Sequence, residues 1–525
     1  MISSSARRKS IVLAATLLLA PAGVAAQEAP EAPAPQEAPA TPAAPAAPND
    51  GAPEEQVPSW RFEPMGEAQL RLHMLSDIPL RPLPGDMDGS TGNLGQNAYL
   101  SSWARLGGQL LYEDSLRFVL QLDVLNGVIA GDVTQGVSDA DFPRDERDFY
   151  ATYPLRWAYV QWDTPYVRLV AGQKGSDWGL GMLANDGTHE RPFGDHGRGD
   201  IVERLAVMTT PLGEGTPWVI GGGADLVFQD SRADLLQNER AVQGFLATWY
   251  QADDVFIGLY GLHRQQWNEL DDHSSVWVLD GHARVETEML GGKGFTAVEA
   301  AAIVGVTEAA QTLTHTEHDV LQALGVVQVG YEQDLFDTTL EAGYATGDSN
   351  AMDGALRRAS FDENFQVGLV LFPEVLAWHS ARAAAWARHE DLVGRPARGS
   401  DELPTNGAVS GAAYLFPHAS VHALPWLELR VGALFAWSTA AVTDPYRQRA
   451  YSENVSWLGG DPTQRYLGTE LDGAVVMHHD LIADELTLTG GVEGGLFMPG
   501  PAFNDAAGSG SDPMGLVRTK VGLLF

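Results

Sequence analysis

Acidic and histidine clusters are the residues of this 525-residue chain whose types could bind a metal. Two acidic stretches, 86–89 and 348–354, begin like calcium-binding loops, but neither has the full ligand spacing with a closing glutamate. The histidines at 478–479 and the pair His315 and His318 lack a third ligand placed by the sequence. The nucleophile-elbow, P-loop and HExxH patterns are also absent from the sequence. We therefore predict no metal site, no cofactor and no enzymatic activity.

Many of the other charged residues fall on segments in which apolar and polar residues alternate. In the last such segment, Leu523 and Val521 alternate with Lys520, and the pattern recurs along the chain from Glu67 to Phe525. A strand of this kind has one face for an apolar phase and one for water. No helical pattern of comparable quality is present, so we predict an all-β protein.

The connections between the predicted strands alternate between short and long. The short ones are 113–115, 163–166, 251–254, 332–337 and 480–484, and the long ones are 76–100, 126–154, 175–200, 346–364, 390–409, 439–465 and 499–513. This order is typical of an up-and-down antiparallel transmembrane β-barrel and not of a sandwich with Greek-key crossings. We count about 20 strands. The weakest hairpin is 366–388, whose alanine-rich second arm could be helical, and without it 18 remain.

The first 58 residues differ from the rest in composition. Residues 1–26 read as a secretory signal peptide, with a basic start, an apolar run over 11–20 and a small-residue cleavage site. Residues 27–58 are rich in Pro, Ala and Glu, which predicts a disordered periplasmic linker before a barrel over 59–525. The chain has no cysteine and no apolar run long enough for a membrane-spanning helix. For an exported β-barrel, this predicts a location in the outer membrane. A formal charge of −36 excludes a typical nucleic-acid binder.

If Phe525 faces lipid, side chains of the opposite parity face water in the barrel lumen. The bases predicted to line this pore are Arg71, Arg105, Arg117, Arg156, Arg168, Arg518 and Lys520. The acids predicted to line it are Glu299, Glu341, Glu428, Glu470, Asp472, Glu485 and Glu493. Because closure brings the last strand beside the first, the bases should gather at that seam and set an ion preference. The alternative is that these groups pair with their neighbours and only stabilise the wall.

Three blocks carry a resemblance to known barrels. The terminal strand ending in Phe525 resembles the last strand of Gram-negative outer-membrane barrels, in which such an aromatic residue is the assembly signal. GQKGSDWGLG at 172–181 looks like a segment of large outer-membrane barrels, and EAGYATGD at 341–348 with FQVGLVLF at 365–372 is similar to alginate-export-like porins and to an uncharacterised family of barrels with Pro/Ala leaders. The resemblance implies outer-membrane lipid, lipopolysaccharide and the barrel-assembly machinery as partners.

These features together predict a porin-like channel for passive diffusion of small polar or charged solutes. The loop at 175–200 is the candidate constriction, because it is long, glycine-rich and carries charges of both signs. Three alternatives stay open. An exporter of an anionic polysaccharide would need a continuous basic track, and a structural or adhesive barrel would not conduct. A barrel enzyme that hydrolyses lipid or peptide would need a serine and a histidine facing one another at the lipid boundary. No strand offers an obvious pair of this kind, and the sequence alone does not exclude a pair formed across two strands.

Overall fold

The computed structural model describes residues 59–525 apart from 84–85, 88, 90–91, 114, 133–153, 195–196, 214, 310–313, 389–403 and 483–484. The chain divides into two units, Met1–Val57 and Pro58–Phe525, and the described residues belong to the second. The predicted signal peptide and linker lie outside the described residues, as does most of the predicted loop at 126–154.

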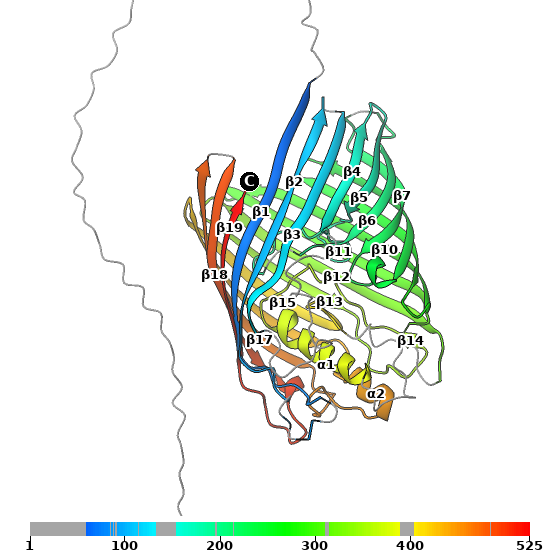
Figure 1. Ribbon diagram of the computed structural model, residues 1–525, viewed down its shortest axis with the longest axis vertical. Helices are drawn as coiled ribbons and strands as arrows, with labels where there is room; N and C mark the ends of the chain where they lie inside the picture. The colour runs from blue at the N-terminus through cyan, green and yellow to red at the C-terminus, as the bar shows by residue number, and fades with distance from the viewer. Residues whose placement is uncertain are drawn as a thin grey trace, which may run out of the picture. The chain divides into compact units, whose positions relative to one another are not determined.

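Eighteen antiparallel strands among the described residues form one closed barrel, which confirms the predicted fold class (Figure 1). They are β1 (Trp60–Leu75), β2 (Asn97–Tyr112), β3 (Leu116–Asp132), β4 (Leu155–Asp163), β5 (Val167–Gly175), β6 (Ile201–Thr209), β7 (Trp218–Gln229), β8 (Arg240–Ala252), β9 (Val255–Trp267), β10 (His273–Met289), β11 (Gly292–Thr307), β12 (His318–Gln333), β13 (Phe336–Ala345), β15 (Ala412–Leu424), β16 (Leu427–Ser438), β17 (Tyr466–Ile482), β18 (Leu486–Pro499) and β19 (Met514–Leu524). Each pairs with its neighbour in sequence, β13 pairs with β15, and β19 pairs with β1 to close the ring. The remaining strand, β14 (Ala355–Leu356), is a two-residue parallel addition to β12.

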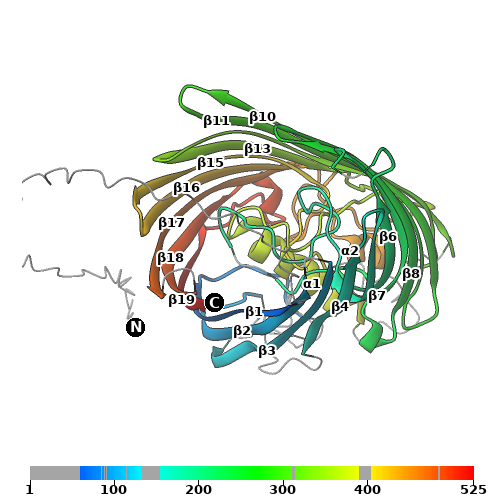
Figure 2. The same cartoon turned by 90° about the horizontal axis from the view of Figure 1, so that it is seen from above.

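The predicted weak hairpin is helical rather than a pair of strands. A π-helical turn, Leu371–Leu376, leads into α1 (Ala377–Arg388), whose alanine-rich sequence favours a helix. Both lie in the connection between β13 and β15, and Figure 2 shows α1 inside the ring of strands. A second helix, α2 (Pro445–Tyr451), and the short 3₁₀ turns Leu235–Gln237 and Pro501–Phe503 also lie in connections. No helix among the described residues is both long and apolar enough to cross a bilayer.

The alternation of short and long connections holds for most of the barrel, with β1 ascending from the short-turn end. It fails at the connection between β9 and β10, where residues 268–272 form a short loop on the long-loop side. The difference in length is also smaller between β6 and β7, where residues 210–217 form the longest connection on the short-turn side. The direction of every strand is unchanged, because each is antiparallel to both neighbours in the ring.

The two faces of each strand differ in the way that the alternating pattern predicts. On β1, Leu70 and Leu72 are 50% and 41% exposed, whereas Arg71 and His73 between and after them are 9% and 4% exposed. Large exposed apolar side chains occur on the same parity around the ring, and the buried charged residues have the opposite parity. The outer surface is therefore an apolar belt and the inner surface is polar.

An apolar cluster lies within the ring beside these polar walls. The connection between β13 and β15 supplies Phe365, Val367 and Phe372, which are fully buried. They belong to one cluster with Phe416 on β15 and Leu434 on β16. The long connection therefore folds inward and packs on the inner wall.

Candidate functional site: the lumen and its inserted loop

The connection between β5 and β6, residues 176–200, enters the lumen and contacts walls on opposite sides of the ring. Because Gly175 pairs directly with Ile201, this inserted loop leaves and re-enters the sheet at one point. Its side chains and backbone bind residues on β4, β11, β13, β16 and β19. A segment with contacts to strands this far apart must cross the interior.

Arg191 is the strongest attachment of the inserted loop. Its guanidinium donates to both carboxylate oxygens of Glu341 on β13, at 2.8 and 3.0 Å, and its Nε donates to the carbonyl of Gln366 at 2.8 Å. Glu341 also accepts from the hydroxyl of Tyr414 at 2.7 Å and from the amide of Gln328 at 2.7 Å. The Glu341 side chain is fully buried, so this charge is neutralised by a bidentate partner and two further donors.

The same loop is bound at the seam where the barrel closes. Lys520 Nζ on β19 donates to the carbonyl of Gly194 at 2.6 Å and lies 3.0 Å from Glu493 Oε1. Arg430 on β16 donates to the carbonyl of Pro192 at 3.1 Å. Directly across the seam, Lys520 pairs in register with Arg71, so two cationic residues are neighbours there.

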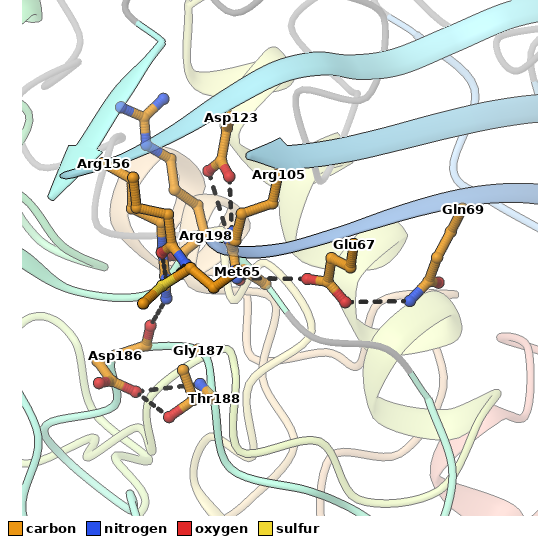
Figure 3. A network of polar contacts seen from close by, with 12 residues as sticks. Met65, Glu67, Gln69, Arg105, Asp123, Arg156, Asp186, Gly187, Thr188 and Arg198 are labelled. Atoms are coloured by element: carbon orange, nitrogen blue, oxygen red, sulfur yellow. Dashed lines mark hydrogen bonds and ion pairs between the residues drawn. The ribbon is translucent and has the colours of Figure 1, made fainter. Parts of the chain in front are cut away.

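An arginine network binds the far end of the inserted loop to the early strands (Figure 3). Arg105 Nε donates to Asp123 Oδ1 at 2.7 Å, and its Nη2 donates to the carbonyl of Gly197 at 3.3 Å. Arg156, fully buried on β4, donates to the carbonyl of Arg198 at 2.9 Å and also to the carbonyl of Asp186. These arginines are therefore attached to the loop backbone as well as to carboxylates.

A glycine allows the inserted loop to approach β11. Glu299 Oε2 accepts a hydrogen bond from the backbone N–H of Leu180. The preceding Gly179 has φ +65°, and a Cβ there would lie 2.5 Å from the same carboxylate oxygen. Both the backbone conformation and the close contact therefore require glycine.

A cavity of about 210 Å³ separates the inserted loop from the wall formed by β6 and by β8 to β12. The loop contributes Trp178 and Asp200, the wall contributes Gln243, and the connection between β13 and β15 contributes Asp362. Burial, with the nearby Glu363 carboxylate, raises the pKa of Asp362 to about 8. Burial and the Asp362 charge also raise the pKa of Asp200. Two of the carboxyl groups that line the cavity therefore have raised pKa values.

A closed strand ring pairs its backbone groups between neighbouring strands, as a bilayer requires, and this ring has an apolar exterior and a charged, loop-filled interior. The chain is an outer-membrane β-barrel. No protein-family model matches it, and no curated protein matches it.

Several solved structures are similar to this outer-membrane barrel over most of its length. Pseudomonas aeruginosa OccK5 (OpdH) aligns with TM-score 0.48 and 10% identity, covering 88% of this chain and 98% of that one. Pseudomonas aeruginosa OprD gives 0.47 and 11%, covering 88% and 95%. Acinetobacter baumannii OccAB1 gives 0.46 and 12%, covering 88% and 96%. These comparisons do not test the predicted likeness to alginate-export-like porins, which stays a prediction.

The residues predicted to line the pore fall into two groups. Those buried on the inner face of the outer-membrane barrel are Arg71, Arg105, Arg156, Arg518, Glu299, Glu341, Glu470, Asp472 and Glu493, with Lys520 and Glu428 half-buried. Arg117 and Arg168 have the inward parity but lie near the short-turn ends of β3 and β5, where both are exposed. Glu485 precedes β18 in a short turn and is exposed, so it lies at the rim rather than on the strand wall.

Several inner-face residues of the barrel escaped the sequence analysis. Arg204 on β6 forms an ion pair with Asp225 on β7 at 2.9 Å, and both side chains are buried. Asp123 and Asp280 are buried on the same face. Each follows the inward parity of its own strand, so the two-residue period would have found them. Arg191 has no such signal, because it lies in a connection and its partner is 150 residues away.

Proposed function

We propose that this outer-membrane barrel is a channel for passive diffusion of small polar or charged solutes, with the inserted loop setting its narrowest part. The observation that carries the proposal is the loop itself, which is bound to opposite walls inside the ring by Arg191, Lys520 and Arg156. A barrel of 16 to 18 strands has an interior too wide for its own side chains to fill. A fixed loop in that interior narrows it without closing the barrel.

Fewer charged residues are available to a solute than the sequence predicted for the pore lining. Arg105, Glu341 and Glu493 are held in ion pairs at 2.7, 2.8 and 3.0 Å, which favours the alternative that such groups stabilise the wall and the loop. Arg117 and Arg168 are exposed at the short-turn mouth, and we propose that they set ion preference there. Arg168 contacts Asp163 at 2.5 Å, with its side chain about half exposed.

The same contacts favour small solutes over an anionic polysaccharide. Export of such a polymer needs a continuous track of accessible bases. Arg105, Arg156 and Lys520 instead donate to carbonyl oxygens of the inserted loop. The loop therefore occupies the groups that a polymer would need.

We also propose that Phe525 serves as the assembly signal read by the barrel-assembly machinery. Its backbone exchanges two hydrogen bonds with Gly66 on β1, at 2.7 and 3.0 Å, so it completes the closing pair of strands. Its ring remains 44% exposed. A Cβ on Gly66 would lie 2.6 Å from that ring, which leaves glycine as the residue that fits beneath it.

Planar-bilayer recording of the purified protein tests the channel proposal. Discrete conductance steps, with a reversal potential that depends on Arg117 and Arg168, are expected. Arg447→Ala is a matched control, because it removes a partly exposed ion pair with Glu453 in the connection between β16 and β17. A protein that is folded, as judged by a change in its electrophoretic mobility on heating, but gives no conductance steps would refute the proposal and favour a structural barrel.

A further inference from the structure

A serine and a histidine face one another on the outer wall of the barrel, where β9 and β10 pair. His263 Nε2 lies 3.2 Å from Ser275 Oγ. The register places His263 opposite Trp277 and Gln265 opposite Ser275, so the two residues are diagonal neighbours on one face. The pair depends on cross-strand register, which explains why neither strand shows it alone.

This face of β9 and β10 is the lipid-facing one. Trp277 and Leu279 have the same parity as Ser275 and are 60% and 61% exposed, and Leu259, of the same parity as His263, is 55% exposed. The residues of opposite parity, Asp280 and Tyr260, are 2% and 8% exposed and line the lumen cavity. Ser275 and His263 therefore point away from the channel.

The pair lies at the level where the apolar belt ends. Trp277 is the last large exposed apolar residue of β10 toward the loop at 268–272, and tryptophan is typical of the bilayer interface. Ser275 is two residues beyond it, about 7 Å along the strand. The loop at 268–272 is on the same side of the barrel as the inserted loop and the other long connections. In outer-membrane barrels the long loops are extracellular, so we assign this side to the outer leaflet. Ester groups of lipids and water both occur at this depth.

Two further polar side chains complete a connected cluster with the pair. The Gln265 amide donates to Ser275 Oγ at 2.7 Å and lies 2.9 Å from His263 Nε2. His273 Nε2 lies 2.6 Å from Gln265 Oε1, which orients that amide. The imidazole of His263 stacks on Trp277, with centroids 4.3 Å apart and planes at 23°. The four side chains form one connected cluster, which brings a hydroxyl, an imidazole and an amide donor together at the depth of the lipid esters.

There is free surface beside the imidazole. Gly244 on β8 is directly opposite His263, and a Cβ built there would have a single backbone oxygen within 4 Å, at 3.9 Å. A side chain at this position would stand next to His263 on the same face. Glycine leaves that space open to a lipid chain.

We propose that Ser275, His263 and Gln265 form a hydrolase site for the acyl ester bond of an outer-leaflet lipid. Ser275 Oγ attacks the ester carbonyl carbon as His263 Nε2 takes its proton, and the ester C–O bond breaks as His263 returns that proton to the leaving alcohol. Water then gives a proton to His263 and attacks the carbonyl carbon of the acyl-serine. The ester bond to Ser275 Oγ breaks as His263 returns that proton to the serine, which releases the fatty acid and restores the site. In the proposed reaction the Gln265 amide, which donates to Ser275 Oγ in the resting site, turns to donate to the negative oxygen formed in both steps, and His273 is a positioning residue for Gln265.

Lipid hydrolysis by the purified full-length protein in vesicles tests this site independently of the channel. One set of vesicles contains phosphatidylethanolamine and a second adds lipopolysaccharide, because both carry acyl esters at this depth. Wild type is expected to release free fatty acid from one set or both, and a long-chain fluorophosphonate is expected to label Ser275. Ser275→Ala should reduce release to the uncatalysed background, His263→Ala by roughly 100-fold or more, and Gln265→Leu by roughly 100-fold.

The chain supplies a matched control on its inner wall. Ser101 Oγ lies 3.0 Å from His73 Nε2 across β1 and β2, but both side chains are buried on the lumen side. Ser101→Ala should therefore leave fatty-acid release unchanged, and Ser275→Ala should leave the conductance steps unchanged, which also shows that it folds. His273→Ala should lower kcat with KM unchanged, and His273→Gln, which keeps a donor, should restore part of it. Absence of both release and labelling in wild type, release that survives in Ser275→Ala, or lipid binding without turnover would overturn the proposal.

Discussion

The Arg191–Glu341 ion pair offers the sharpest test of the inserted loop. Arg191→Ala removes two charge-assisted hydrogen bonds at 2.8 and 3.0 Å and a third to Gln366 at 2.8 Å, and it leaves the Glu341 carboxylate buried without its cation. Removing one partner of a buried ion pair costs about 3–5 kcal/mol. Water screens this ion pair little, because the side chains of Arg191 and Glu341 are only 9% and 0% exposed. We therefore expect the free energy that holds the inserted loop against β13 to fall by about 3–5 kcal/mol.

Two assays measure the effect of Arg191→Ala on the attachment of the inserted loop. In planar bilayers, Arg191→Ala should give larger or noisier conductance steps, because the loop loses its attachment to β13. Limited proteolysis should cut within residues 176–200 of the variant faster than in wild type. The double variant Arg191→Met with Glu341→Gln should lose less attachment than Arg191→Ala, since no uncompensated charge remains.

An exposed ion pair provides the comparison for these assays. Arg168→Ala removes a contact with Asp163 at 2.5 Å, but the arginine is about half exposed. Such a pair contributes about 0–1 kcal/mol, so loop cleavage should not change. Equal conductance, noise and cleavage in wild type and Arg191→Ala would refute the reasoning that this pair fixes the loop.

Three further predictions follow from the same contacts. Arg117→Glu or Arg168→Glu should shift the reversal potential toward cation selectivity, and an unchanged potential would count against a basic short-turn mouth. Burial alone would lower the pKa of His189, but the Asp177 carboxylate 2.5 Å away raises it above the ordinary 6.5, so the pair stabilises the loop fully below that pH and stops doing so as the pH rises through the raised value. Open-channel noise should therefore grow on alkalinisation, and His189→Gln should remove the pH dependence. Glu470→Gln should destabilise the barrel toward guanidinium in detergent by about 1–3 kcal/mol, because Glu470 accepts backbone N–H groups of residues 369–371 at 2.5, 2.8 and 2.7 Å, and wild-type stability would contradict this.

The strand ring was predictable because its signal is local. Residues such as Leu70 and Arg71 face lipid and lumen by simple alternation, and the alanine-rich arm before Arg388 indicated the helix that replaces a hairpin. Closure of β19 on β1 followed from an even number of antiparallel strands. It brings Lys520 opposite Arg71 at the seam.

The interior was less predictable because its contacts join distant parts of the chain. Nothing near Arg191 in the sequence specifies Glu341, and nothing near Leu180 specifies Glu299. Arg156 was predicted to face the pore, but its attachment to the loop carbonyl of Arg198 depends on how the loop folds. A one-residue slip between β9 and β10 would also have separated His263 from Ser275.

Osmotic swelling of proteoliposomes tests the central claim, diffusion through a lumen narrowed by the inserted loop, most directly. Vesicles containing the folded wild-type protein should swell in small polar solutes and more slowly as solute size rises. Arg191→Ala vesicles should admit larger solutes than wild type. Vesicles that stay impermeable to every solute, with the barrel shown to be folded, would contradict the claim.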